Sequence, residues 1–256
     1  MPWNPEKYNQ FKNIRFQPFF DLSELIQDEN LKTAVDLGCG TGEQTKILSE
    51  KFENTQFIGL DASPEMLAKS KNLESNNLHF QQKTTEDFIK ERNKYDLIFS
   101  NAALQWSNHH AKLFSQLLNL VNTNGQFAVQ MPMQGDNILN QLLLQLADEE
   151  PFQTYLKGWR RDYTLLTIDE YTTILFEAGL QNINVMQKVY PIIANDVETL
   201  FDFISGSALI PYLERLTEDQ QMEFTNTFKQ KISEAFPKFP AIYAFKRILM
   251  YGQKEN

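Results

Sequence analysis

Short apolar runs alternate with longer amphipathic stretches along the first half of the chain. Five runs have the length and composition of strands, at residues 34–37, 56–60, 78–82, 95–100 and 126–131. Helices are predicted in between, over about 43–52, from a Ser63 cap and Pro64 onward, over 86–91 and over 109–121. Residues 122–125 have the composition of a turn. This alternation predicts a parallel sheet covered by helices on both faces.

The pattern is looser after Met131. Helices are expected over about 138–149 and 167–178, then a strand over 182–193, a helical region over 197–236 and a closing strand over 241–252. A helical insert before the last strand would lie over one end of the sheet as a cap. The predicted division is an N-terminal helical segment (1–30), an α/β core (31–194), a helical cap (195–238) and a closing strand of the core sheet (239–256).

Composition and charge exclude several classes of protein. The 256 residues include 24 basic and 33 acidic side chains, a net charge of −9, which disfavours binding to nucleic-acid phosphates. No apolar run is long enough to span a bilayer, so no membrane partner is expected. The N-terminal residues do not resemble a secretion signal, and a single cysteine excludes an internal disulfide. We therefore expect a cytoplasmic protein.

The histidines and the cysteine give no sign of nucleophilic or metal chemistry. His109 and His110 are adjacent at the start of a predicted helix, so they cannot share a face, and we expect surface or capping residues. Cys39 lies in a glycine loop where a small residue is needed. No cluster has the spacing of metal ligands, so no metal is expected.

Three glycines follow the first predicted strand, at Gly38, Gly40 and Gly42. A glycine loop between a strand and a helix is a common ligand site in α/β sheets, because glycine allows a sharp turn and close approach to a ligand. A dinucleotide-binding loop would place its third glycine at position 43, where Glu43 would repel a pyrophosphate. Asp61 ends the next strand and suits a ribose whose two hydroxyls donate hydrogen bonds. A dehydrogenase is therefore disfavoured.

The segment 35–42, followed by the acid at the end of the second strand, resembles the S-adenosylmethionine (SAM) site of class I methyltransferases. Further segments are similar to the trans-aconitate 2-methyltransferase family over nearly the whole chain; they are residues 3–8 with Arg15 and Pro18 beyond them, 60–67, 95–106, 129–132 and 205–213. The resemblance implies an α/β fold of the class I methyltransferase (Rossmann-like) type, a mostly parallel seven-stranded sheet with helices on both faces and a helical cap inserted before the last strand. It also implies SAM as the cofactor.

The resemblance further implies a set of cofactor-binding residues. They are Trp3, Tyr8, Arg15, Asp36, Gly38, Gly40, Asp61, Ala62, Met66, Thr85 and Asn101. Asp36 would lie beside the amino group of the methionine part, and Asp61 at the ribose hydroxyls. The N-terminal segment would close over the cofactor, with Arg15 pairing with its carboxylate. Thr84 stands where the family often has an aspartate, which leaves the amide of Thr85 to contact the adenine.

The acceptor is expected to be a carboxylate, which is ionised at neutral pH and needs no general base. Gln105 and Trp106 match a pair that related carboxyl methyltransferases place at the acceptor; otherwise Trp106 is a core residue and Gln105 caps the next helix. Several negative charges on the acceptor require cationic partners. The candidates are Arg160, Arg161, Lys188, Lys246 and Arg247. We assign Gln105, Trp106, Arg160, Tyr212 and Arg247 to the substrate site.

These observations predict a SAM-dependent O-methyltransferase that forms a methyl ester on a small polycarboxylate, by resemblance trans-aconitate. The alternative is a methyltransferase of the malonyl-carrier-protein type, although a net charge of −9 disfavours docking of an acidic carrier protein. Another small-molecule carboxyl methyltransferase and a SAM-binding protein without transferase activity are further alternatives. A monomer or dimer is expected.

Overall fold

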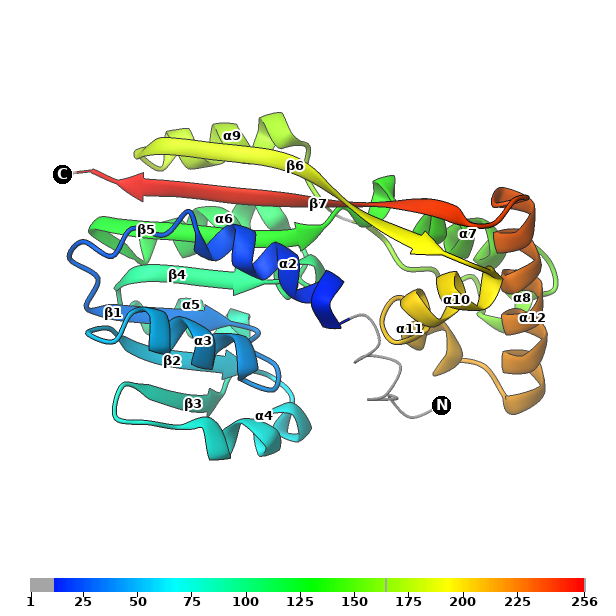
Figure 1. Ribbon diagram of the computed structural model, residues 1–256, viewed down its shortest axis with the longest axis horizontal. Helices are drawn as coiled ribbons and strands as arrows, with labels where there is room; N and C mark the ends of the chain where they lie inside the picture. Colours follow the sequence, from blue (N-terminus) through cyan, green and yellow to red (C-terminus); the bar gives the residue numbers. More distant parts are fainter. Residues whose placement is uncertain (1–11, 164, 256) are drawn as a thin grey trace. The chain divides into compact units, whose positions relative to one another are not determined.

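The structure is a computed structural model that describes residues 12–163 and 165–255, with side chains from Phe16 onward (Figure 1). Seven strands form one sheet in the order β3-β2-β1-β4-β5-β7-β6. Their bounds are β1 Thr33–Leu37, β2 Gln56–Asp61, β3 Leu78–Gln82, β4 Tyr95–Asn101, β5 Val121–Pro132, β6 Leu180–Ala194 and β7 Ala241–Lys254. Strands β1 to β5 are parallel, and β7 is antiparallel to β5. This confirms the predicted mostly parallel, seven-stranded sheet.

Among the described residues, the chain falls into two compact units. The sheet unit comprises residues 17–132, 165–188 and 247–255, and the helical unit comprises residues 12–16, 133–163 and 189–246. The predicted division placed residues 133–163, 189–194 and 239–246 with the α/β core, whereas they belong to the same compact unit as the expected cap. Strands β6 and β7 each contribute residues to both units.

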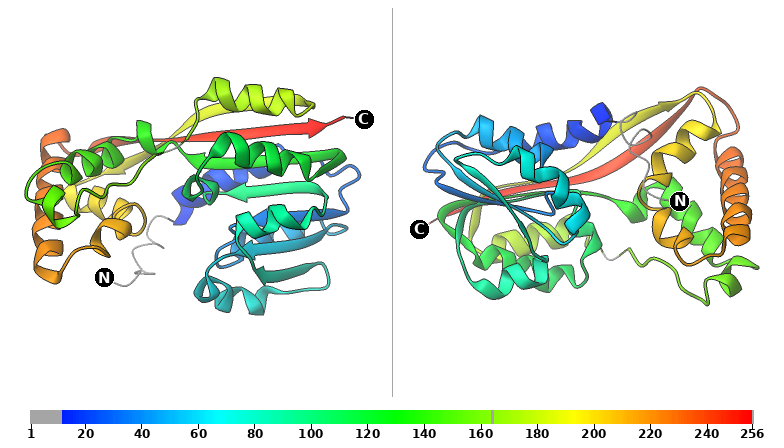
Figure 2. Two further views of the ribbon diagram at one scale, coloured as in Figure 1. Left: turned by 180° about the vertical axis from the view of Figure 1, so that it is seen from behind. Right: turned by 90° about the horizontal axis from the view of Figure 1, so that it is seen from below.

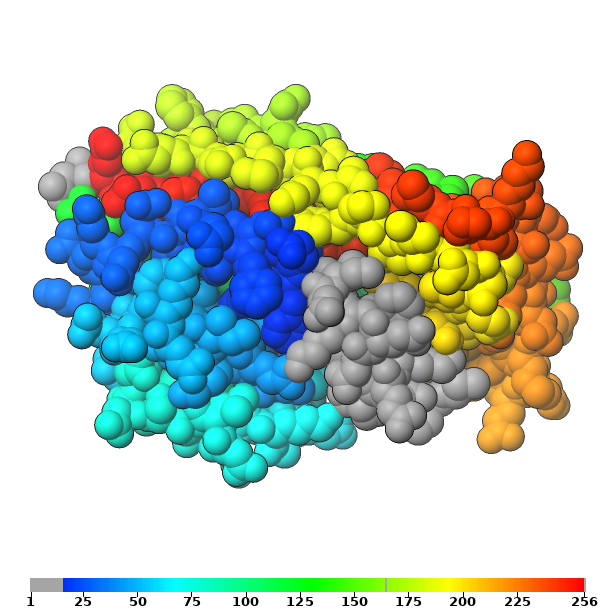
Figure 3. All heavy atoms as spheres, in the orientation of Figure 1, coloured from blue at the N-terminus to red at the C-terminus, as the bar shows by residue number. Residues whose placement is uncertain are grey.

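Helices cover both faces of the sheet within the sheet unit. Its helices are α2 Lys12–Ser23 (which begins in the helical unit), α3 Glu43–Lys51, α4 Pro64–Ser70, α5 Thr85–Glu91, α6 His110–Asn119 and α9 Ile168–Glu177, with the short turns η1 Lys71–Leu73 and η2 Leu104–Trp106. Helices α2 and α3 lie on one face, and α5, α6 and α9 on the other (Figures 1 and 2). In the space-filling view, α2 and α3 cover the face of the sheet unit that is turned toward the reader (Figure 3).

The helical unit has an apolar core of its own. Its helices are η3 Gln134–Asp136, α7 Ile138–Ala147, α8 Phe152–Tyr155, α10 Val197–Ser205, α11 Ile210–Leu213 and α12 Glu218–Ala235. The region predicted as one helical stretch over 197–236 is thus three helices. Leucines at 139, 142, 143 and 146 recur at helical spacing on α7 and are buried in this core. Residues of α7 and α8 therefore pack with those of α10 to α12, which explains why 133–163 cluster with the cap.

The predicted strand over 126–131 begins earlier in the structure, at Val121. Residues 122–125, predicted as a turn, form an irregularity inside this longer strand. Tyr95 pairs with Val121 but Leu97 pairs with Gln126, so the register shifts across them, and Asn124 has a φ of 62°. The predicted turn at 122–125 is therefore wrong, because these residues belong to β5 as a local irregularity of the strand. No helix in the described part of the chain is long and apolar enough to cross a membrane.

Candidate functional site

The loop after β1 is held against the end of β2 by backbone hydrogen bonds. The amides of Gly38 and Cys39 donate to the carbonyl of Leu60 at 2.7 and 3.0 Å. Gly38 has a φ of 76°, and a Cβ there would lie 2.1 Å from the Cβ of Ala103. Glycine is therefore required at this position by backbone conformation and by space. Gly40, with a φ of 57°, differs, because a Cβ there would meet no atom of the described residues within 4 Å. Among these residues, the loop is uncovered at Gly40.

Asp61 connects the glycine loop to the next helix. Its Oδ2 accepts a hydrogen bond from the amide of Gly40 at 2.9 Å, and its Oδ1 accepts one from the amide of Ser63 at 2.8 Å. Ser63 in turn caps α4 by accepting from the amide of Met66 at 3.2 Å. An ionised carboxylate has about four acceptor positions, so Asp61 keeps capacity for the two hydroxyls of a ribose.

Asp36 lies near the end of β1 and is 3% exposed. The hydroxyl of Thr45 on α3 donates to its Oδ2 at 2.6 Å. Burial raises the pKa of Asp36 to about 7, the Thr45 hydrogen bond opposes this shift, and the negative charge of Asp61 adds to it. A cationic ligand group at the loop would restore the ionised form and be held by it.

Burial and the nearby carboxylates also set the pKa of the Cys39 thiol. Burial raises the pKa of its thiol, and the charges of Asp36 and Asp61 add to the effect. The thiolate is the reactive form of cysteine, so this thiol is unreactive near neutral pH.

Asn101, at the end of β4, carries a buried acceptor on the carboxyl edge of the sheet. Its Nδ2 donates to Oε1 of Gln44 on α3 at 2.9 Å. Its Oδ1 is buried and accepts no hydrogen bond from the part of the chain that the structure describes. Buried polar atoms normally have partners, so this oxygen indicates a ligand with a donor. Because β1 and β4 are parallel neighbours, Asn101 and the glycine loop share the edge where ligands of open α/β sheets bind.

Gln105 and Trp106 follow on η2, directly after this edge. Gln105 is 6% exposed, and its Nε2 donates to the carbonyl of Ala102 at 2.7 Å. Trp106 is 40% exposed and therefore is not a core residue. The alternative in which Trp106 is a core residue is thus wrong, and His109 rather than Gln105 takes the cap position of α6.

Arg247, on β7, is buried in the sheet unit with 6% exposure. Its Nη1 donates to Oε1 of Gln130 at 2.7 Å. Gln130 on β5 is the register partner of Asn101 on β4, and Arg247 is the register partner of Pro132. The guanidinium is therefore tied to the same carboxyl edge of the sheet as Asn101.

The structure gives most of the other candidate cations partners of their own. Arg160, which was predicted to bind the substrate, is exposed, and its Nη1 lies 2.6 Å from Oδ2 of Asp148. It therefore forms a surface ion pair in this structure. Lys188 pairs with Asp21 at 2.6 Å, and Nζ of Lys246 donates to the carbonyl of Asp136 at 2.7 Å.

Arg161, next to Arg160, lies in a different environment. It is half-buried in the helical unit, and burial lowers the pKa of its guanidinium while nearby Tyr163 and Tyr212 oppose that shift. Tyr212 is fully buried, and Asn140 on α7 donates to the hydroxyl of Tyr163 at 3.2 Å. A polar cluster of Arg161, Tyr163, Tyr212 and Asn140 therefore lies within an otherwise apolar unit. Tyr163 was not predicted, since no motif surrounds it.

The remaining predicted residues are placed as follows. Ala62 is exposed after Asp61, and Met66 is half-buried in the first turn of α4. Thr84 uses its side chain to cap α5, accepting from the amide of Asp87 at 3.1 Å, and Thr85 is the first residue of that helix. The first amides of a helix have no partner within it, so the amide of Thr85 remains suited to a ligand. Trp3, Tyr8 and the side chain of Arg15 lie outside the described residues.

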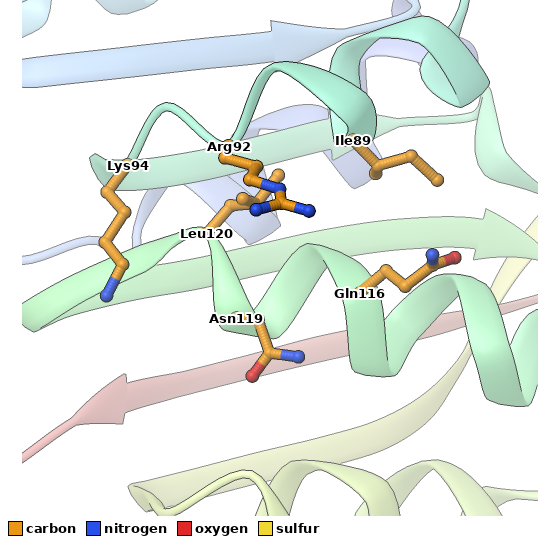
Figure 4. A pocket seen from close by; sticks show the side chains of 6 residues that line it. All are labelled: Ile89, Arg92, Lys94, Gln116, Asn119 and Leu120. Atoms are coloured by element: carbon orange, nitrogen blue, oxygen red, sulfur yellow. The ribbon is translucent and has the colours of Figure 1, made fainter.

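A pocket of about 310 Å³ lies at the other edge of the sheet unit (Figure 4). Its lining residues are Ile89, Arg92, Lys94, Gln116, Asn119 and Leu120. These residues precede β4 and β5 in the chain and so lie at the amino ends of the strands, whereas the glycine loop lies at the carboxyl ends. The pocket is not the site built by the loop.

Known proteins resemble this chain over its full length. Residues 28–179 match the model of a family described as a methyltransferase domain. The chain is 38% identical over 260 residues to the trans-aconitate 2-methyltransferase of Deinococcus radiodurans, and the match covers 99% of both proteins. This chain belongs to the trans-aconitate 2-methyltransferase family. A second member, from Escherichia coli, is 30% identical over 263 residues, with 98% of each chain covered.

Solved structures show the same fold outside the trans-aconitate 2-methyltransferase family. The YcgJ protein of Bacillus subtilis has a TM-score of 0.59 at 18% identity, over 93% of this chain and 98% of its own. Phosphoethanolamine N-methyltransferase 2 of Haemonchus contortus, solved with S-adenosylhomocysteine, has a TM-score of 0.57 at 18% identity, over 97% of this chain and 53% of its own. The fold is that of class I methyltransferases.

As a member of the trans-aconitate 2-methyltransferase family, the chain is a SAM-dependent methyltransferase. The residues present fit this cofactor. Among the described residues, nothing fills the space at Gly40 beside Asp61, and Oδ1 of Asn101, which accepts no hydrogen bond from them, suits a donor such as an amino group. The buried carboxyl of Asp36 suits the positive charges that SAM carries.

Proposed function

We propose that this methyltransferase forms a methyl ester on a small polycarboxylate, with trans-aconitate as the acceptor. The names of the relatives, at 38% and 30% identity over nearly the full chain, support this acceptor. The structural observation that carries the proposal is the buried guanidinium of Arg247 at the carboxyl edge of the sheet. A planar guanidinium matches a carboxylate in two parallel hydrogen bonds, and burial strengthens such a pair.

The reaction requires little acid–base catalysis from the side chains of this protein. Bound SAM supplies an electrophilic methyl group on a positively charged sulfur. The chain's own residues would hold the acceptor carboxylate close to the cofactor and exclude water from it. A carboxylate is already ionised at neutral pH, and no general base is required.

Each part of the cofactor and the reacting carboxylate has a candidate partner in the sheet unit. We assign Asp61 and Ala62 to the ribose, Asp36, Gly38, Gly40 and Asn101 to the methionine part, and Met66 and the Thr85 amide to the adenine. Trp3, Tyr8 and Arg15 stay predictions for closure over the cofactor. On the acceptor, Gln105 and Trp106 position the reacting carboxylate beside Arg247.

A polycarboxylate has further charges, and Arg161 of the helical unit is a candidate partner for an anion; the roles of Arg160 and Tyr212 at the acceptor stay predictions. The half-buried position of Arg161 favours it, since a cation already partly removed from water gains more from a bound anion than an exposed one. The phenols of Tyr163 and Tyr212 supply donors of a kind that carboxylates accept.

The test is transfer of labelled methyl groups from SAM to a panel of acceptors. The panel is trans-aconitate, cis-aconitate, citrate, isocitrate and malonyl-carrier protein. Label on trans-aconitate in preference to the other small acids is the expected result. Label on the carrier protein alone would show that the protein is a malonyl-carrier-protein methyltransferase instead. SAM binding without any labelled acceptor would overturn the proposal.

A further inference from the structure

His110, the first residue of α6, is buried with 1% exposure, so the expectation of a surface or capping residue is wrong for it. His109 takes the cap position and is exposed, as expected. The ring of His110 lies between two polar groups: Nδ1 is 2.7 Å from the hydroxyl of Tyr171 on α9, and Nε2 is 3.1 Å from the carbonyl of Ser107. Tyr171 is itself fully buried.

Only one assignment of protons satisfies all of these groups. The Ser107 carbonyl can only accept, so Nε2 of His110 carries the proton and donates. Nδ1 then accepts from the Tyr171 hydroxyl, whose oxygen accepts from the amide of Leu166 at 3.3 Å. A neutral imidazole thus completes a continuous chain of hydrogen bonds in a site where an unpaired polar group would be costly.

This chain of hydrogen bonds ends on the turn that carries the proposed acceptor residues. Ser107 directly follows η2, and its amide donates to the carbonyl of Leu104, the first residue of that turn, at 3.0 Å. The carbonyl of Ser107 is therefore fixed from α9 through His110, while Gln105 and Trp106 lie between the two ends of the turn. The rings of His110, Phe114 and Tyr171 pack together, with 5.5 Å from His110 to Phe114 and 4.9 Å from Phe114 to Tyr171.

We propose that His110 and Tyr171 are positioning residues that hold the Gln105–Trp106 turn through the Ser107 carbonyl, and so set the binding of the acceptor without affecting the binding of SAM. The proposal rests on the proposed acceptor role of Gln105 and Trp106. Neither His110 nor Tyr171 touches the reacting atoms in this scheme.

The test is Tyr171→Phe, which removes the hydroxyl and keeps the ring. It deprives both Nδ1 of His110 and the amide of Leu166 of a partner. We expect the KM for trans-aconitate to rise about tenfold, while the dissociation constant of SAM stays within about twofold of the wild type. Isothermal titration with SAM and initial rates at saturating SAM measure the two quantities on the same preparation.

The matched control is Phe114→Leu, in the same aromatic cluster. It removes ring packing but leaves the hydrogen bonds from Leu166 to Ser107 in place, so we expect lower thermal stability with an unchanged acceptor KM. Equal effects of Tyr171→Phe and Phe114→Leu on both KM and SAM affinity would mean general loosening and would overturn the proposal.

Two further variants keep the outcome decisive. His110→Gln keeps an amide donor for the Ser107 carbonyl, so it should retain a lower acceptor KM than His110→Ala. Equal KM values for the two contradict the proposal even if Tyr171→Phe fails to fold.

Gln105→Ala separates the proposed acceptor site from the proposed positioning role. If Gln105→Ala raises the acceptor KM and Tyr171→Phe does not, only the positioning role falls; if Gln105→Ala leaves it unchanged, the proposed acceptor site falls and the positioning role with it.

Discussion

Asp36 is a residue whose place in the fold lowers the stability of the ligand-free protein. Its folded pKa is raised to about 7 from 3.8, so the folded state binds the proton more tightly than the unfolded chain does. The stability that this group contributes is present in full below pH 3.8 and is lost as the pH rises toward 7. Above that range the fold holds a buried negative charge, which suits it to a cationic ligand.

Asp36→Asn should therefore stabilise the ligand-free protein at pH 8, by about 1–3 kcal/mol. The amide keeps an oxygen for the Thr45 hydroxyl and avoids the buried charge. At pH 5 the gain should be smaller, and below pH 3.8 it should disappear, because the carboxyl is then protonated in both the folded and the unfolded state. SAM affinity should fall at least about tenfold at pH 8. Chemical denaturation at both pH values and titration calorimetry check these results, and an equal gain at pH 5 and pH 8 would contradict the assigned cause.

The adjacent arginines of the helical unit offer a matched pair of substitutions. Arg161→Ala tests whether this half-buried cation binds a carboxylate of the acceptor; if it does, the KM for trans-aconitate should rise about tenfold or more. Arg160→Ala removes only an exposed ion pair with Asp148 and should leave the KM within about twofold. Steady-state rates with varied acceptor measure both. Equal effects, or a larger effect of Arg160→Ala, would remove Arg161 from the acceptor site.

At the scale of elements, Asp96 joins the starts of three neighbouring strands. Its Oδ2 accepts from the amides of Lys32 and Thr33 at 3.0 and 2.9 Å, and its Oδ1 accepts from Nδ2 of Asn122 at 2.7 Å. Burial opposes ionisation, but these hydrogen bonds prevail and hold the pKa of Asp96 below its usual range. Asn122 belongs to the irregular start of β5, so Asp96 stabilises the part of that strand that local sequence predicts as a turn.

Asp96→Ala should destabilise the protein by about 2–3 kcal/mol near neutral pH, because several backbone and side-chain donors lose their acceptor. The stability that Asp96 contributes is lost as the pH falls through its lowered pKa, so the difference between the variant and the wild type should shrink in strong acid. Urea titrations at pH 7 and at acidic pH measure this. SAM affinity of the folded variant should be unchanged, which separates Asp96 from the residues of the ligand site.

Local patterns were sufficient for most strands and for the loop, and insufficient for packing between distant segments. Gly38 and Asp61 were found because a glycine spacing and a strand-end acid are local signals. The pair of His110 and Tyr171 was missed because it joins residues 61 positions apart. Arg160 and Arg161 are adjacent residues of the same type, so the sequence could not tell which of them is exposed and which is half-buried. The apolar spacing of α7 predicted a helix but could not name the helices against which it packs.

At the scale of the whole molecule, neither compact unit is a continuous piece of chain. The chain passes from one unit to the other after residues 16, 132, 163, 188 and 246, and the last two of these points lie inside β6 and β7. Since a strand is a continuous element, unfolding of one unit disrupts strands that the other needs. We expect cooperative loss of both units together.

Tryptophan fluorescence can check this cooperativity, because Trp106 lies in the sheet unit and Trp159 in the helical unit. In a Trp3→Phe background, Trp106→Phe and Trp159→Phe each leave a single reporter. We expect the two urea transitions to coincide, with midpoints within about 0.2 M once each variant's own stability is taken into account by far-UV circular dichroism. A reporter whose transition clearly precedes loss of circular dichroism would show that its unit unfolds alone.

The sheet order has a consequence for synthesis on the ribosome. Strand β7 lies between β5 and β6, yet it is made after the six strands with which it shares the sheet. The nascent chain therefore holds β5 and β6 with open edges until Ala241–Lys254 emerges, and open edges are templates for pairing with other chains. A stop codon upstream of Ala241 leaves the edge of β5 permanently unpaired, so the truncated chain is prone to aggregate.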